Sequence, residues 1–280
     1  MYTCVEQETQ TQSKSPIPES FTSCQGDGNY AGALIRHTTG YNALPMPSST
    51  QKRSPLRRLI GVLAIVVLAL LLAPYAIAPV YRFIDPVSTP MLWRWATGAR
   101  VERDAVPLSR IAPALPLAVI VAEDGSFCRN HGIDLGAMRE ALQQSDDDVA
   151  AARGASTITQ QTAKNLFLWQ GRSFVRKALE LPLALWINLV LPKRRVLEIY
   201  LNIAAWGPNG EFGAEAAARW AFNKSARDLT GREAAELAAI LPNPVRRSAR
   251  APSTLVRRLA GLYERRSAAH PALDACSRSH

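Results

Sequence analysis

The chain has 280 residues, of which 48% are hydrophobic, so it is long enough for one or two domains with a packed core. Its formal net charge of +10 would suit a nucleic-acid-binding protein, but the basic residues are divided between the flank of a long apolar segment and the C-terminal region. Because the apolar segment predicts an exported domain, which meets lipid headgroups rather than DNA, we expect no nucleic-acid partner.

The N-terminal tail and the apolar segment after it predict a single membrane anchor. Residues 1–55 are rich in Ser, Thr, Gln, Pro and Gly, which predicts a disordered cytoplasmic tail, or a stretch upstream of the true start. From Leu59 to Val80 the chain is uncharged over about the length that a membrane-spanning helix needs, so we expect a transmembrane helix at 56–80. A cleaved signal peptide is the alternative, but its apolar run would be shorter and would begin earlier.

The charges around this segment predict its orientation. Basic residues precede it, at Lys52, Arg53, Arg57 and Arg58, and acidic residues follow it. By the positive-inside rule the N-terminus is cytoplasmic, and the bulk of the chain, which follows the single span, is exported.

The rest of the chain predicts a connector and a mainly α domain. Residues 81–103 are expected to form the connector, with Trp93 and Trp95 at the membrane interface or docking it on the domain. Between 104 and 250 apolar residues recur at helical spacing, and no run of alternating strand residues is convincing. Residues 143–153 are expected to be a loop, and 251–280 a C-terminal basic helix and tail. The expected helices span 110–122, 134–144, 156–167, 173–190, 193–203, 211–221 and 230–241.

The four cysteines do not predict a disulfide framework. Cys4 and Cys24 belong to the predicted cytoplasmic tail, whereas Cys128 and Cys276 belong to the exported part and are far apart in sequence. The topology would allow one disulfide between Cys128 and Cys276, which we do not expect. No CxxC or His/Cys spacing indicates zinc.

The first candidate site is the pair Glu123 and Asp124, which ends an apolar run. A carboxylate at the end of a buried helix is partly desolvated, which raises its pKa and suits a general acid or base. Alternatively, the two acids end a helix in solvent. Phe127 could wall such a pocket, and His131 is more simply explained as a core or helix-start residue.

The second candidate site is one face of the helix expected at 156–167. Ser156 or Thr157 would cap this helix. Counted from Thr157, Gln161, Lys164 and Asn165 follow at +4, +7 and +8, so their side chains share one face. Neutral hydrogen-bonding groups ending in one cation suit a sugar that carries a phosphate. The alternative is a solvated face behind a Ser/Thr cap.

A third candidate group lies on the next helix, at Arg176, Lys177 and Glu180. Arg176 and Glu180 are four residues apart, and a surface ion pair of small value is the simplest interpretation. Together with Lys164, these residues could instead form a cationic cradle for a diphosphate, with a second carboxylate nearby.

Five segments together resemble the monofunctional biosynthetic peptidoglycan transglycosylases, whose domain is also the glycosyltransferase half of bifunctional penicillin-binding proteins. Each segment is weak evidence alone, but all five occur in the family's order and spacing between about 100 and 245. They are EDGSF at 123–127, GASTITQQTAKNLFLW at 154–169, RKALE at 176–180, KRRVLEIYLNIAAWG at 193–207 and FGAEAAARWAF at 212–222.

The resemblance implies a lysozyme-like, mainly helical fold and the polymerisation of lipid II, the undecaprenyl-diphosphate-linked disaccharide pentapeptide. Glu123 corresponds to the general base that deprotonates the 4-hydroxyl of the acceptor sugar. That oxygen attacks the anomeric carbon of the donor with inversion, which forms a β-1,4 bond and releases undecaprenyl diphosphate. Glu180 corresponds to a second carboxylate that organises the donor site. The matched substrate-binding positions are Asp124, Phe127, Ser156, Thr157, Gln161, Lys164, Asn165, Arg176 and Lys177.

The resemblance also implies the cofactors and partners. It implies no organic cofactor, and Mg²⁺ or Mn²⁺ assisting the diphosphate, although no ligand set in the sequence indicates which residues would bind a metal. The implied partners are lipid II, the growing glycan strand, the inner membrane, and division or elongation proteins of cell-wall synthesis. No S-x-x-K motif with a later K-T-G occurs, so we expect no transpeptidase activity.

The chain departs from the family pattern at two positions. Asn130 stands where many relatives carry His, with His131 one place later, so a role for either residue is doubtful. Ala205 stands where relatives have Glu, which removes a supporting contact.

Two other functions compete with synthesis. A lytic enzyme of the same fold would also use one acid, but it has no diphosphate substrate and does not require the cations Lys164, Arg176 and Lys177. An inert membrane-anchored scaffold would not require Glu123 and Glu180 in their full motifs. Glycan synthesis therefore explains the sequence best.

Overall fold

The computed structural model describes residues 3–8, 20–25, 55–143, 156–171 and 173–278, and the chain divides into two units, Met1–Arg53 and Ser54–His280. In the first unit, β1 (Thr3–Glu8) pairs antiparallel with β2 (Ser20–Gln25). The Thr, Val, Cys and Phe residues in the two strands favour extended backbone. Most of the tail expected at 1–55 lies outside the described residues, so its disorder stays a prediction.

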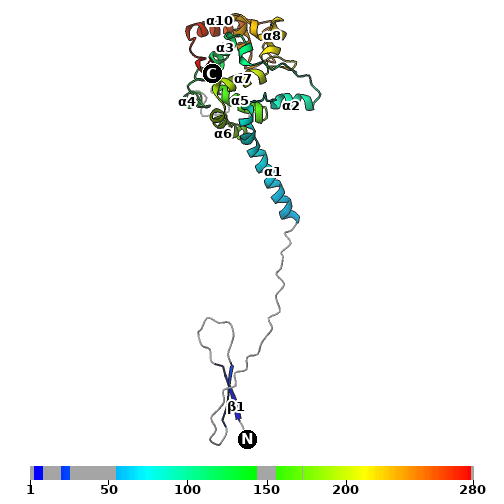
Figure 1. Cartoon of the computed structure of the whole chain (residues 1–280), viewed down its shortest axis with the longest axis vertical. Helices are drawn as coiled ribbons and strands as arrows, with labels where there is room; N and C mark the ends of the chain where they lie inside the picture. The colour runs from blue at the N-terminus through cyan, green and yellow to red at the C-terminus, as the bar shows by residue number, and fades with distance from the viewer. Residues whose placement is uncertain (1–2, 9–19, 26–54, 144–155, 172, 279–280) are drawn as a thin grey trace. The chain divides into compact units, whose positions relative to one another are not determined.

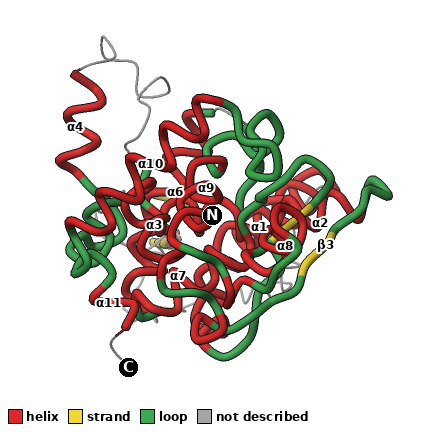
Figure 2. The backbone as a smooth tube through the Cα atoms, turned by 90° about the horizontal axis from the view of Figure 1, so that it is seen from above, coloured by secondary structure: helices red, strands yellow, loops and turns green. Residues whose placement is uncertain are grey.

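The second unit is mainly helical, as the sequence predicts (Figures 1 and 2). A two-stranded parallel sheet, β3 (Glu102–Arg103) with β4 (Glu211–Phe212), is its only strand pairing in the described residues. The α-helices are α1 (Pro55–Ile77), α2 (Thr89–Ala96), α3 (Ala114–Glu123), α4 (Leu135–Gln143), α5 (Ile158–Phe167), α6 (Phe174–Val190), α7 (Lys193–Ile203), α8 (Ala214–Phe222), α9 (Gly231–Ile240), α10 (Thr254–Ala269) and α11 (Ala275–Arg278). The short 3₁₀ helices are η1 (Ala78–Arg82), η2 (Leu108–Arg110) and η3 (Ala226–Asp228).

Helix α1 and the η1 turn that continues it form an apolar span, Pro55–Arg82, which is long enough to cross a membrane. It is the only such helix in the described part of the chain, and its apolar side chains are exposed, as those of a single-pass membrane anchor would be. Figure 1 shows α1 extending from the rest of the unit beside α6. There the Trp186 indole donates a hydrogen bond of 2.9 Å to the carbonyl of Tyr75, which joins the anchor to the domain.

The domain core surrounds α7, in which every residue from Val196 to Ile203 is buried. Helices α5 and α6 pack together, α5 also packs on α7, and α9 packs between α3 and α10. Helix α3 buries Leu115, Val119 and Ile120 in this core, so its last residue, Glu123, emerges at a fixed position beside α5.

Most of the expected helices begin within a few residues of the predicted positions, and their caps explain why. Thr157 caps α5 and Thr230 caps α9, each with a reciprocal bond from the third residue of the helix. Helix α3 begins at Ala114 rather than 110, because a 3₁₀ turn and Pro113 precede it. Helix α8 begins at Ala214 rather than 211, because the preceding residues pair as β4 and Gly213 has φ +90°.

Three further expectations, on the disulfide, the connector and the loop, have different outcomes. Cys128 and Cys276 form a disulfide, contrary to expectation, because α11 packs against α7 and brings the C-terminal cysteine to the loop after α3. Trp93 and Trp95 are more than half exposed on α2, so they do not dock the connector on the domain. Most of the loop expected at 143–153 lies outside the described residues.

Candidate active site

The candidate base is the last residue of α3, and α5 and α7 hold it in place. The Gln161 amide donates a hydrogen bond of 2.7 Å to the Glu123 carboxylate. The Tyr200 hydroxyl on α7 in turn donates to the Gln161 carbonyl at 3.0 Å. These two bonds fix the orientation of the amide, so its NH₂ group points at Glu123 and not away from it. Two successive hydrogen bonds thus connect three helices, from Tyr200 to Gln161 and from Gln161 to Glu123.

Burial raises the pKa of the Glu123 carboxyl above its ordinary value. The hydrogen bond from Gln161 and the positive charge of Lys164 oppose this rise by stabilising the carboxylate. A carboxylate with a raised pKa accepts a proton more readily, which is the property that a general base needs. This agrees with the buried-helix-end interpretation of the sequence.

Asp124, the next residue, connects the end of α3 to the start of α5. It is buried, and its carboxylate accepts hydrogen bonds from the backbone N–H of Ile158 at 3.0 Å and from the Asn130 amide at 2.9 Å. Burial raises the pKa of Asp124, while these bonds lower it. All the hydrogen bonds given for Asp124 are therefore within the protein, and they tie the end of α3 to the start of α5.

Asn130, which donates to Asp124, is itself held by Lys193. The Lys193 ammonium donates to the Asn130 side-chain carbonyl at 2.9 Å and lies 4.7 Å from the centre of the Phe127 ring. Burial lowers the pKa of Lys193 to about 8. Phe127 is fully buried in the core and does not wall an open pocket, while His131 is exposed and not part of the core.

The predicted face of α5 is present, but its members differ in their contacts. Gln161, Lys164 and Asn165 are half-buried, as expected for one helical face. Among the described residues, the side chain of Asn165 accepts only a long hydrogen bond from Gln170, at 3.4 Å. The Thr157 hydroxyl is buried and donates to the carbonyl of Gly132 at 2.6 Å, so it supports the helix start. Gly154, the first residue of this motif, lies outside the described residues.

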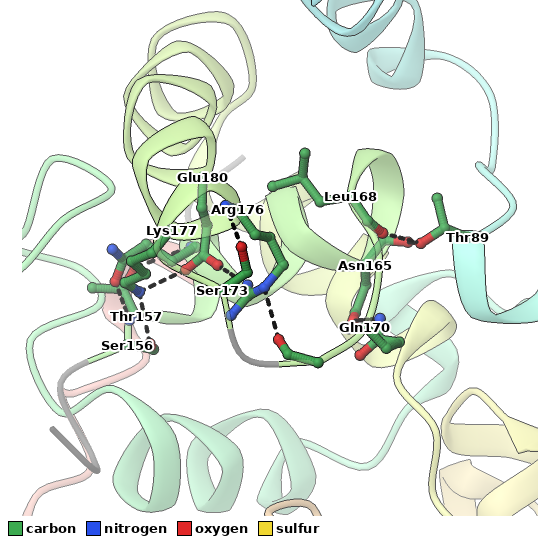
Figure 3. Close-up of polar contacts among 12 residues, drawn as sticks. Thr89, Ser156, Thr157, Asn165, Leu168, Gln170, Ser173, Arg176, Lys177 and Glu180 are labelled. Carbon is green, nitrogen blue, oxygen red and sulfur yellow. Dashed lines mark hydrogen bonds and ion pairs between the residues drawn. The ribbon is translucent and has the colours of Figure 1, made fainter. Parts of the chain in front are cut away.

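The predicted group on α6 forms a compact cluster (Figure 3). Glu180 is only 2% exposed, and its carboxylate accepts hydrogen bonds from both Arg176 and, at 2.7 Å, Lys177. The Lys177 ammonium also donates to the Ser156 hydroxyl at 3.0 Å, which ties the start of α5 to α6. The ion pair is therefore a buried one and not the exposed pair that the simplest interpretation of the sequence describes.

Lys164 lies between these two groups. Burial lowers the pKa of its ammonium, and Glu180 and Glu123 oppose that effect while the nearby cations add to it. Its ammonium forms no hydrogen bond or ion pair with the described residues. A desolvated cation that no carboxylate contacts directly is costly to the fold. It is also well suited to bind an anionic ligand between Glu123 and the α6 cluster.

The side chains present do not fit a resident metal ion. No group of three or more His, Cys, Asp or Glu side chains in the described ranges could hold one. Both carboxylate oxygens of Glu180 are paired, with Arg176 and Lys177, and one oxygen of Glu123 accepts from Gln161.

Sequence reasoning missed three residues of this arrangement. Tyr200 and Lys193 lie in the segment 193–207, which supports the family resemblance as a motif, but the sequence gives neither residue a role. Their signal was present, since a Tyr and a Lys on a helix with a fully buried interior each need a polar partner. Thr89, on α2, donates to the carbonyls of Asn165 and Leu168 at the end of α5, and no local pattern indicates that contact.

Comparisons with known proteins agree with this geometry. The family described as transglycosylase matches residues 91–266. A biosynthetic peptidoglycan transglycosylase of Nitrobacter hamburgensis is 58% identical over 208 residues, which cover 74% of this chain and 92% of that protein. Proteins of the same name from Rhodopseudomonas palustris and Agrobacterium fabrum are 57% and 50% identical, over 76% and 75% of this chain and 90% and 92% of theirs. The region matched by the family contains all five motifs and every predicted site residue, and the chain belongs to the transglycosylase family.

Proposed function

We propose that this chain is a peptidoglycan glycosyltransferase that polymerises lipid II into β-1,4-linked glycan strands. The observation that carries the proposal is the position of Lys164, a desolvated cation without a direct carboxylate partner among the described residues, between a candidate base and the α6 cluster. A donor that loses a diphosphate needs positive charge at its leaving group, whereas hydrolysis of finished glycan does not. The relatives are named for the same biosynthetic activity.

On the acceptor side, Glu123 removes the proton from the 4-hydroxyl of the acceptor sugar. The raised pKa makes its carboxylate an effective proton acceptor. The hydrogen bonds from Tyr200 to Gln161 and from Gln161 to Glu123 hold one carboxylate oxygen, so that the other can face the substrate. The acceptor oxygen attacks the anomeric carbon of the donor from the face opposite the leaving group. The new bond is therefore formed with inversion of configuration.

On the donor side, the leaving group is undecaprenyl diphosphate. Lys164, Arg176 and Lys177 stabilise the charge that develops on it as the glycosidic bond breaks. Glu180 holds Arg176 and Lys177 in place and reduces their mutual repulsion. Ser156 and Asn165 are the polar contacts to the donor sugar in this proposal. The predicted Mg²⁺ or Mn²⁺ remains a prediction without a protein site, and no step here depends on it.

The topology and partners belong to the same proposal. The single apolar helix anchors the protein, and the basic residues before it favour a cytoplasmic N-terminus and a periplasmic domain in the bacterial inner membrane. Lipid II would then be drawn from the membrane beside the anchor. Division or elongation proteins of cell-wall synthesis remain the predicted protein partners.

The test is to incubate the detergent-solubilised full chain with lipid II and to measure polymer by gel electrophoresis. Glu123→Gln should reduce the polymerisation rate roughly 100-fold or more, because the amide cannot accept the proton. Glu140→Gln, an exposed glutamate on α4, is the matched control and should retain wild-type activity. Normal polymerisation by Glu123→Gln would reject the base assignment, and absence of polymer from the folded wild type would reject the function.

A second variant tests the donor side. Lys164→Met should lower kcat/KM for lipid II by about 10- to 100-fold, since the loss of one charged contact to a phosphate is worth about 1.5–3 kcal/mol. The same change should leave Tm unchanged or higher, because it removes a desolvated charge. Lys224→Met, at an exposed ion pair with Glu233, is the control for loss of a lysine. A Lys164→Met protein with wild-type kinetics would remove the main support for diphosphate binding.

A further inference from the structure

A cavity of about 710 Å³ lies where the chain leaves the membrane helix. One side is formed by Arg82, the last residue of η1, and by Phe83; the other is formed by the first turn of α7 with Lys193 and Arg194. The residues described as lining it include none of those assigned to the sugar or the diphosphate. We propose that this cavity binds the phosphate-bearing headgroup of an anionic phospholipid of the surrounding membrane.

The cavity has an excess of positive charge that the protein does not neutralise. Four basic and two acidic residues line it, and both acids, Asp85 and Glu198, are paired with Arg195. The guanidinium groups of Arg82 and Arg194 form no hydrogen bond or ion pair with any described residue. Two guanidinium groups are therefore free to bind a phosphate, for which their planar fork of donors is well suited.

The start of α7 adds donors to the same place. The residue before the helix is Pro192, which supplies no side-chain cap, and the Arg195 N–H donates to its carbonyl at 2.9 Å. The N–H groups of Lys193 and Arg194, which precede Arg195 in this 11-residue helix, therefore have no side-chain cap. These groups and the helix dipole favour an anion at this end. A phosphate that contacts Arg194 would thus also lie near the positive end of α7.

The apolar surroundings identify the anion as part of a lipid. Arg82 is the last residue of the apolar span, and Phe83, which follows it, is 82% exposed. On α6, which contacts α1 through Trp186, Leu185 and Leu189 are also exposed, Leu189 by 76%. Exposed apolar side chains beside paired arginines suit the boundary between acyl chains and headgroups. A free phosphate would use the arginines but not the apolar surface.

Arg195 keeps the two sides of the cavity together. Its guanidinium donates to the carbonyls of Tyr81 and Ile84 at 2.8 and 2.6 Å, and it pairs with Asp85 at 2.9 Å. The connector is therefore fixed against α7, and Arg82 and Arg194 line the same cavity from these two segments. The site would work in the same way in either orientation of the membrane helix, because the anchor and the cavity are adjacent in one unit.

The test uses the full chain in detergent with equal amounts of phosphatidylglycerol and phosphatidylcholine, and counts retained lipids by native mass spectrometry. The wild type should retain phosphatidylglycerol preferentially. The double variant Arg82→Gln with Arg194→Gln should bind it roughly 25-fold less tightly, since each arginine near an anionic lipid contributes about fivefold. Arg82→Lys with Arg194→Lys should retain most of the binding, which separates loss of charge from loss of fold.

The matched control removes the same charge at the other end of the domain. Arg227→Gln with Arg258→Gln changes two exposed arginines, one beside α8 and one on α10, and should leave lipid retention unchanged. Equal loss in this control, or no loss in the Arg82 and Arg194 variant, would overturn the proposal. Displacement of phosphatidylglycerol by millimolar inorganic phosphate would also overturn it in favour of a free-phosphate site. The readout does not depend on glycan synthesis.

Discussion

At the scale of single residues, Gln161 controls the candidate base. Its amide donates to Glu123, and this bond lowers a carboxyl pKa that burial raises. Tyr200 holds the amide in the orientation that permits the bond. Gln161 is therefore a positioning residue whose contribution is visible in the pH dependence of the reaction.

Gln161→Leu should move the acid limb of the pH–rate profile to higher pH. The base acts as a carboxylate, so activity falls as the pH falls through the pKa of Glu123. Removing the hydrogen bond raises that pKa further, so activity is lost at a higher pH than in the wild type. The measurement is the rate of lipid II polymerisation from mildly acidic to neutral pH. Gln170→Leu, which lacks contact with Glu123, should keep the wild-type profile, and an unshifted Gln161→Leu profile would refute the coupling.

At the scale of elements, the start of α5 determines where Gln161 and Lys164 lie. Thr157 caps this helix, accepts from the N–H of Gln160 at 3.1 Å, and donates to Gly132. The Asp124 carboxylate accepts from the N–H of Ile158 in the same turn. Helix α5 is thus tied at its first turn to the loop that follows Glu123.

Two cap variants separate the effect on stability from the effect on function. Thr157→Val and Thr230→Val each remove a capping-box hydroxyl, from α5 and α9 respectively, and each should cost about 1 kcal/mol of unfolding free energy. Only Thr157→Val should also reduce polymerisation, because α5 carries the site. Thermal unfolding and lipid II turnover measure the two effects. If Thr230→Val reduced turnover as strongly, the loss would be due to general destabilisation.

At the scale of the whole molecule, the Cys128–Cys276 disulfide closes a loop of 148 residues that contains α4 to α10. Replacing both cysteines by serine should lower the free energy of unfolding by about 2–5 kcal/mol, because the unfolded chain regains the entropy that the cross-link removes. Differential scanning calorimetry with and without reductant measures the effect. Reductant should lower Tm of the wild type and leave the double variant unchanged; equal sensitivity of both would show that the disulfide is not responsible.

The sequence predicts the helices well because their apolar spacing and caps are local, as at Thr157 and Thr230. It also predicts that Arg176 and Glu180 pair, since that contact lies within one helix. Contacts between distant segments have no such local signal. The link from Lys193 to Asn130 and the disulfide depend on how α7 and α11 pack, so sequence separation was a poor guide to both. The catalytic and binding roles remain predictions.

Helix α7 also fixes the distance between Arg195, which holds the connector, and Tyr200, which orients Gln161. Arg195, in its first turn, holds the connector that leaves the membrane helix, and Tyr200 on the same helix orients Gln161 beside the base. Five residues of α-helix separate the two side chains by about 7.5 Å along the axis. One helix therefore fixes the separation between the connector that follows the apolar span and the side chain that orients Gln161 beside Glu123. Inserting or deleting a residue between Arg195 and Tyr200 would move the candidate base relative to the span by about 1.5 Å and turn it by about 100° around the helix axis.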